Sequence, residues 1–199
     1  MKPEDTGFET RIPVRSASKL SAFAIVAVAT FFWHANAPAA PSNPLTRNYA
    51  APELSGGPWI NTPGGKALSL KARRGQVTVV HFWTFACSNC RANLPVYARW
   101  RDEFAPRGVA VIGVHSPELP HEKDEANLRR EIKSLGIEFP VLVDRDGSNW
   151  QRWNQQYWPT IYLIDRQNRV RYVWIGETGD EGAKTMSRRI AELLAEVPK

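Results

Sequence analysis

The chain has 199 residues, and its 26 basic and 20 acidic side chains give a formal charge of +6. This length accommodates one domain with a full hydrophobic core and is short for two. The positive charges are scattered, so we interpret them as a solvated surface and expect no nucleic-acid partner.

The first forty residues predict an export element. Residues 20–33 (LSAFAIVAVATFFW) carry no charge, basic residues precede them, and the sequence ANA at residues 35–37 has the form of a signal-peptide cleavage site. Left uncleaved, the apolar stretch predicts an anchor whose basic flank stays in the cytoplasm. We therefore expect residues 1–40 to be a signal peptide or a single membrane anchor, and the remainder to lie in the periplasm or another extracytoplasmic space.

Residues 41–57 are rich in Pro, Gly, Ser and Asn and predict a flexible linker ahead of one domain at residues 58–199. Two strands are predicted first in this domain. Residues 67–70 form a short apolar run. Residues 76–83 are apolar almost throughout, which is typical of a central strand covered on both faces.

A helix is predicted directly after Cys90 and ends at residues 105–108, because large apolar residues recur at helical spacing: Leu94, Tyr97, Trp100 and Phe104. A strand at residues 109–115 follows. A second helix at residues 122–135 is expected to stop at Gly136.

The C-terminal third predicts a strand at residues 141–144, a hairpin of residues 160–165 and 169–175, and a last helix at residues 181–197. Strands that alternate with helices and close on a hairpin predict a mixed α/β sheet with helices on both faces. The last helix is expected to bury five apolar residues: Met186, Ile190, Leu193, Leu194 and Val197.

Cys87 and Cys90, the two cysteines of the chain, form a CxxC motif. A structural zinc site usually takes four ligands, and the histidines are not spaced to complete one. Covalent haem would need His where Arg91 stands. A purely structural disulfide would close a very short loop and remove little entropy from the unfolded chain. Redox chemistry is the interpretation that remains.

The predicted strand, turn and helix give the two thiols different environments. Cys87 is expected at the helix N-terminus, where free backbone N–H groups and the helix dipole stabilise a thiolate, and Arg91 adds positive charge. Cys90 lies one turn further on the same face, close enough for a disulfide but more buried. We therefore expect Cys87 to attack and Cys90 to resolve.

With these motifs, the sequence resembles the thioredoxin superfamily, most of all its exported TlpA/ResA-like branch and the C-terminal thioredoxin domain of DipZ-type proteins. The resemblance covers residues 59–194. Three segments carry most of it: FWTFACSNCRANLP at 82–95, VIGVHSPE at 111–118 and YWPTIYLID at 157–165. The sequence departs from the ResA-like group at Asn93, where that group often has Glu, and it has a Ser-Asn spacer where thioredoxin has Gly-Pro.

The resemblance implies a thioredoxin fold, a mixed central β-sheet with helices on both faces, here with an N-terminal β-hairpin extension formed by residues 65–70 and 74–77. It also implies that Pro159 is a cis-proline facing the dithiol and pairing with an incoming peptide. Trp158 and Tyr157 would then form an aromatic wall for the substrate. Without the resemblance, Pro159 is equally compatible with an ordinary turn.

His81 lies six residues before Cys87, where ordinary thioredoxins have a buried acid that relays a proton to the inner cysteine. A neutral imidazole at this position could accept the proton of Cys90; the alternative is a hydrogen-bonded core histidine. His115 and Glu118 fall at a strand end near the expected active face. Solvated loop residues are the simpler interpretation of both.

The sequence thus predicts an exported thiol–disulfide oxidoreductase that mainly reduces protein disulfides and needs no cofactor or metal. Because one hydrophobic segment is present, a separate membrane protein is expected to donate electrons. Two alternatives remain open. One is a thiol peroxidase of the same fold, and the other is a copper-binding chaperone in which His115 or His81 joins the cysteines as a ligand.

Overall fold

The computed structural model describes residues 43–197. The predicted signal peptide or anchor at residues 1–40 lies outside this part of the chain. Among the described residues, no helix combines the length and the apolar character needed to cross a membrane.

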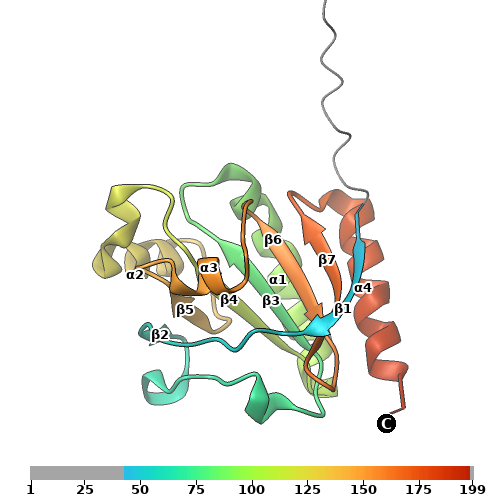
Figure 1. Ribbon diagram of the computed structural model, residues 1–199. Helices are drawn as coiled ribbons and strands as arrows, with labels where there is room; N and C mark the ends of the chain where they lie inside the picture. The colour runs from blue at the N-terminus through green and yellow to red at the C-terminus, as the bar shows by residue number, and fades with distance from the viewer. Residues whose placement is uncertain (1–42, 198–199) are drawn as a thin grey trace, which may run out of the picture. The chain divides into compact units, whose positions relative to one another are not determined.

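Seven strands form one mixed sheet in the order β1-β7-β6-β3-β4-β5-β2 (Figure 1). The three strands β3, β4 and β5 run parallel, and every other neighbouring pair is antiparallel. The strands are β1 (Leu45–Ala50), β2 (Trp59–Ile60), β3 (Thr78–Trp83), β4 (Ala110–His115), β5 (Val141–Val143), β6 (Thr160–Ile164) and β7 (Arg169–Ile175).

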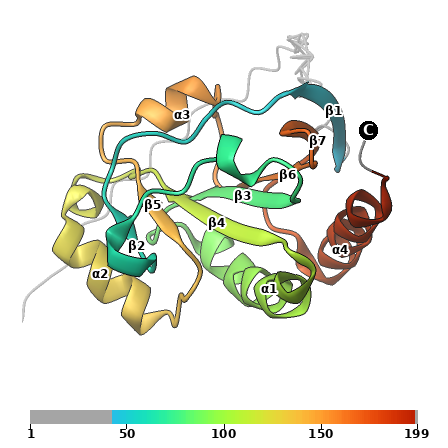
Figure 2. The same cartoon turned by 90° about the horizontal axis from the view of Figure 1, so that it is seen from below.

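Four α-helices accompany the sheet: α1 (Ser88–Phe104), α2 (Glu125–Ser134), α3 (Ser148–Arg152) and α4 (Gly179–Ala195). Viewed from below, α1, α2 and α4 lie on one face, whereas α3 and the chain between β1 and β3 lie on the other (Figure 2). The predicted mixed sheet with helices on both faces is confirmed.

Successive side chains of β3 point to opposite faces of the sheet and so contribute to two hydrophobic cores, one on each face. Val79 and Trp83 pack into the cluster beneath α1, whereas Val80 and Phe82 pack into the cluster beneath α3. Every residue of β3 is therefore buried, as predicted for a central strand. The predicted helix after Cys90 is confirmed as α1, because its four apolar residues are all buried: Leu94, Tyr97, Trp100 and Phe104.

The predicted N-terminal β-hairpin extension is wrong. β1 and β2 lie at opposite edges of the sheet, and residues 67–70 form no strand. Leu70 does bury its side chain, but its backbone N–H donates to the Glu53 carboxylate at 2.6 Å and not to a strand partner. Gly57, at φ +61°, packs so closely against β5 that a Cβ would lie 2.3 Å from the carbonyl oxygen of Val143. The segment between β1 and β2 therefore runs across the sheet from one edge strand to the other.

Part of the segment predicted as a flexible linker belongs to the fold. Its residues 45–50 form β1, which pairs with β7 at the edge of the sheet. Just before β1, the side chain of Asn43 makes two hydrogen bonds with the backbone of Ile175, of 2.8 and 3.1 Å. Ile175 in turn lies opposite Thr160, the first residue of β6. The folded domain therefore starts ahead of residue 58.

The last two predicted helices shift at their ends. Residues 120–123 form a separate 3₁₀ turn, and α2 starts only at Glu125, where the Asp124 side chain caps it. α4 ends at Ala195, so Val197, predicted to be buried, is 82% exposed.

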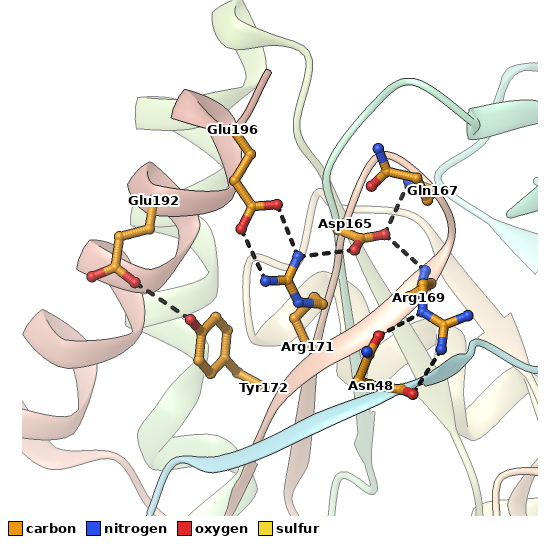
Figure 3. A network of polar contacts seen from close by, with 8 residues as sticks. All are labelled: Asn48, Asp165, Gln167, Arg169, Arg171, Tyr172, Glu192 and Glu196. Carbon is orange, nitrogen blue, oxygen red and sulfur yellow. Dashed lines mark hydrogen bonds and ion pairs between the residues drawn. The ribbon is translucent and has the colours of Figure 1, made fainter. Parts of the chain in front are cut away.

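A polar network ties the end of α4 to the sheet (Figure 3). Arg171 on β7 makes two hydrogen bonds to the Glu196 carboxylate, of 2.8 and 3.0 Å, and one of 3.1 Å to the buried carboxylate of Asp165. Arg169 extends the network to Asn48 on β1. The network thus joins the edge strand, the β6–β7 hairpin and the C-terminal helix.

Candidate active site

The two cysteines lie where β3 passes into α1. After β3 ends at Trp83, residues 84–86 form a turn, and Cys87 is the N-cap residue of α1. Its sulfur accepts a hydrogen bond from the backbone N–H of Cys90 at 3.3 Å. Both thiols are free; Cys87 is partly exposed, and Cys90 is fully buried. The fold therefore exposes the thiols unequally, in the predicted order.

The surroundings of Cys90 favour its protonated thiol. Burial raises the pKa of Cys90, the hydrogen bond with Cys87 raises it further, and a hydrogen bond from the backbone of Thr84 opposes the shift only in part. For Cys90 to act as a nucleophile, a base has to remove its proton.

His81 lies on the α1 side of β3, with no exposed surface. Neither ring nitrogen has a hydrogen-bond partner among the described residues, so the imidazole is not bonded directly to Cys90. Burial lowers the pKa of His81 to about 3, and the ring is therefore neutral at pH 7. The unprotonated ring nitrogen is free to accept a hydrogen bond, but the burial that keeps the ring neutral also makes it a weak base.

His115 is buried, contrary to its interpretation as a loop residue. As the last residue of β4 it faces Trp83 across the parallel pair, with ring centroids 5.3 Å apart, and its ring stacks on Phe85 at 5.4 Å. Burial lowers the pKa of His115 to about 4, although the charge of Glu122 opposes this shift. Glu118 is exposed, as expected for a loop residue.

The residues predicted as a substrate wall directly precede β6, whose first residue, Thr160, pairs with Phe82 near the end of β3. The Trp158–Pro159 bond is cis, and Pro159 is buried. Trp158 packs against the same core cluster as Cys87, and its indole N–H donates to the backbone of Ser116 at 3.1 Å. Tyr157 is 55% exposed. Pro159 is therefore buried, whereas Trp158 and Tyr157 keep accessible surface.

A second tryptophan completes this wall, which the sequence did not predict. Trp150 on α3 stacks on Trp158 with ring centroids 4.0 Å apart and planes 29° from parallel. A pocket of about 170 Å³ lies against the two indoles, with Lys123 and Arg145 at its rim. The short helix α3 thus supports the wall from outside the dithiol motif.

Asn93, the departure from the ResA-like pattern, is buried and links α1 to the chain that follows β7. Its amide donates to the Gly176 carbonyl at 3.2 Å and accepts from the backbone N–H and hydroxyl of Thr178 at 3.0 and 3.1 Å. An ionised carboxylate could not donate to that carbonyl. Asn93 therefore acts in this fold as a connector between α1 and α4.

Glu122 is a site residue that sequence reasoning missed. Its carboxylate is buried, and it accepts hydrogen bonds from the Thr84 hydroxyl and the backbone N–H of Ala86, in the turn before Cys87. A glutamate in a polar stretch is ordinarily solvated, so the sequence carried no distinctive signal.

The copper-binding alternative needs a third ligand beside the two cysteines. Among residues 43–197, no three His, Cys, Asp or Glu side chains are grouped so that they could hold a metal ion. The described residues give that alternative no support.

An unequally buried dithiol at a helix N-terminus, on a mixed sheet of this topology, defines a dithiol protein of the thioredoxin superfamily. A sequence model of the AhpC/TSA family matches residues 48–173, and the chain belongs to this family.

The chain is similar to many known proteins, among them the following three. Protein DipZ of Mycobacterium tuberculosis is 38% identical over 141 residues, which are 70% of this chain but 20% of DipZ, so the chain spans about a fifth of that relative. Thiol-disulfide oxidoreductase YkuV of Bacillus subtilis is 26% identical over 146 residues, 73% of this chain and 94% of YkuV. The solved structure of a thiol-disulfide isomerase from Corynebacterium glutamicum has a TM-score of 0.64 at 29% identity, covering 74% of this chain and 98% of that one.

Proposed function

We propose that this protein is exported and reduces disulfides of other proteins outside the cytoplasm, with Cys87 as the attacking and Cys90 as the resolving thiol. The observation that carries the proposal is the unequal exposure of two free thiols at the start of α1. A protein substrate can reach the sulfur of Cys87, whereas Cys90 can react only with a sulfur already attached to Cys87.

Two exchange steps complete the reduction. The Cys87 thiolate attacks one sulfur of the substrate disulfide, the S–S bond breaks, and the released substrate sulfur takes up a proton. Cys90 then loses its proton and attacks the Cys87 sulfur of the mixed disulfide. The second substrate thiol leaves, and the pair becomes a disulfide. Two electrons have passed to the substrate, so a donor outside the described domain must return two for each turnover.

The second step is where His81 fits. The pKa of Cys90 is raised by burial, and the neutral imidazole of His81 lies on the same side of β3, within the core beneath α1. We assign His81 as the acceptor of the Cys90 proton through an intervening water. Trp158, Pro159 and Tyr157 are assigned to binding of the substrate peptide. For export we assign residues 1–40, and for electron supply a separate membrane dithiol protein.

Equilibration of the full chain with glutathione tests the direction of electron flow. A reductase has a disulfide that forms more readily than that of glutathione, so its potential is the more negative of the two. A more positive potential would make the protein an oxidase and overturn the reductase assignment. Rapid consumption of hydrogen peroxide by Cys87 without Cys90 would favour the peroxidase alternative.

A reporter fused after Lys199 tests the location. An enzyme active only outside the cytoplasm should work in this fusion, because the basic residues before the apolar stretch hold the other end inside. Activity of a reporter that works only in the cytoplasm would overturn export.

A further inference from the structure

The Glu122 carboxylate joins two loops that meet beside the dithiol. One oxygen, Oε1, accepts the Thr84 hydroxyl and the Ala86 backbone N–H, the latter at 3.0 Å. The other oxygen, Oε2, accepts the backbone N–H groups of Glu118 and Leu119, both at 2.9 Å. One side chain therefore fixes both the turn before Cys87 and the loop after β4.

Glu122 is held as an anion by hydrogen bonds. It is 1% exposed, and none of the ion pairs within residues 43–197 involves it. Burial by itself would raise the pKa of Glu122, but the four hydrogen bonds outweigh burial and hold the pKa below its ordinary value. An ionised carboxylate is acceptor-only, so it can serve four donors at once, which a neutral side chain of this size cannot.

The donors on Oε1 belong to the residues that place the sulfurs. Ala86 directly precedes Cys87, whose sulfur accepts the Cys90 N–H at the start of α1. The backbone of Thr84 lowers the pKa of Cys90 and opposes part of the rise that burial causes. Between them, Phe85 stacks on His115. A turn free to move at residues 84–86 would displace the Cys87 sulfur from the Cys90 N–H whose hydrogen bond it accepts.

We propose that Glu122 is a positioning residue for the dithiol: by pinning residues 84–86, it keeps Cys87 in the geometry that activates its thiol. This inference rests on the proposed function in taking Cys87 as the attacking thiol. Glu122 has no contact with substrate in this role and acts only through the turn.

The negative charge of Glu122 and its hydrogen bonds to the turn predict opposite effects of Glu122→Gln on the rate at which Cys87 is alkylated. Removal of a nearby negative charge would, through space alone, favour the Cys87 thiolate and speed its alkylation. In contrast, loss of a carboxylate oxygen as hydrogen-bond acceptor would loosen the turn at residues 84–86 and slow the alkylation of Cys87. Thr84→Val removes the hydroxyl donor without changing any charge, so it reports position alone.

The test is the rate at which iodoacetamide alkylates Cys87 in the reduced full chain at pH 7, followed by mass spectrometry and expressed per folded molecule. We expect Glu122→Gln to slow alkylation by about three- to tenfold and Thr84→Val to slow it in the same direction, with effects in the double variant that do not add. Glu125→Gln, which changes an exposed pair with Arg129, is the matched control and should leave the rate unchanged.

The outcomes separate this inference from the proposed function. Faster alkylation of Glu122→Gln, or rates equal to wild type in both Glu122→Gln and Thr84→Val, would overturn the positioning role. Wild-type alkylation no faster than that of an unfolded cysteine peptide would instead overturn Cys87 as an activated nucleophile, and with it the proposed function. Unfolding by urea, measured on each variant, corrects the rates for loss of folded protein.

Discussion

The imidazole of His81 lies almost face to face with the phenol ring of Tyr97, with ring centroids 3.8 Å apart and planes 20° from parallel. Phe139 meets the same imidazole edge-on at 5.0 Å. The titratable ring of His81 is thus held in the core by aromatic packing. Within the described chain its ring nitrogens make no hydrogen bond. This relationship leads to two separable predictions, one for stability and one for catalysis.

The first prediction is that His81 makes the fold sensitive to acid. Its pKa is lowered from 6.5 to about 3, so the unfolded chain binds this proton first, and stability is lost as the pH falls from about 6.5 towards 3. His81→Phe keeps an aromatic ring but cannot titrate. Urea unfolding at pH 7, 5 and 4 should show that the free energy of unfolding falls less steeply with decreasing pH in this variant than in wild type. The difference in slope should be up to about 1.4 kcal/mol per pH unit. His115 should supply part of the loss that remains. Identical slopes in variant and wild type would contradict the prediction.

The second prediction concerns proton transfer. If His81 accepts the Cys90 proton, His81→Phe should slow the release of reduced substrate from the mixed disulfide by about 100-fold or more, because a positioned general base contributes roughly 10²- to 10⁴-fold. Formation of the mixed disulfide should be unchanged. Rapid-quench analysis of a single turnover separates the two steps. Equal release rates per folded molecule would leave His81 as a core residue only.

The third prediction concerns the order of the two sulfurs. Cys90→Ser removes the resolving thiol and leaves the exposed Cys87 intact, so it should accumulate covalent complexes with substrates that dithiothreitol dissolves. Cys87→Ser should accumulate few or none. Non-reducing gels and mass spectrometry of the trapped species provide the measurement. The reversed pattern would show that Cys90 is the thiol that meets substrate.

A fourth prediction concerns the aromatic wall. Trp158→Ala removes the indole that stacks on Trp150 and bonds to Ser116, so reduction of a protein disulfide should fall by about tenfold. Reaction with a small disulfide should change by less than about twofold, because a small molecule does not need the wall. Tyr49→Ala, which removes another exposed aromatic ring on β1, is the control. Equal losses with both disulfides would point to a damaged dithiol and not to a binding surface.

The fifth prediction concerns the network at the end of α4. Arg171→Met would leave the buried Asp165 carboxylate without its cation and free Glu196, and we expect a loss of about 1–2 kcal/mol in the free energy of unfolding. Arg129→Met breaks an exposed pair within α2 and should cost less than about 0.5 kcal/mol. Urea unfolding at pH 7 compares them. Similar losses in both variants would mean that the network adds no more than a surface ion pair.

The sequence predicted the elements whose signals are local. β3 is a continuous apolar run and α1 has apolar residues at helical spacing, so both were correct, and the CxxC motif between them located the dithiol. β1 was missed because its residues are mostly exposed and its partner is β7, more than a hundred residues away. The pairing of an edge strand depends on that distant neighbour and leaves little trace in its own sequence.

The buried polar residues around the dithiol, Glu122 and His115, were also missed because their neighbours are distant in the sequence. Glu122 is bound by Thr84 and Ala86, which are 38 and 36 residues away, and mostly through backbone N–H groups that any residue type carries. Similarly, the burial of His115 follows from its register beside Trp83, which only the folded sheet defines.

The position of Asn43 bears on how other molecules reach the dithiol. Asn43 is hydrogen-bonded to Ile175 on β7, which lies opposite Thr160 on β6. Thr160 in turn lies opposite Phe82 on β3. This row of neighbours leads across the sheet from the start of the folded domain to the end of β3 that precedes the dithiol. The preceding chain therefore joins the folded domain at the same end of the sheet as the dithiol. A substrate or electron donor that reaches Cys87 has to approach the domain at the end where that chain enters.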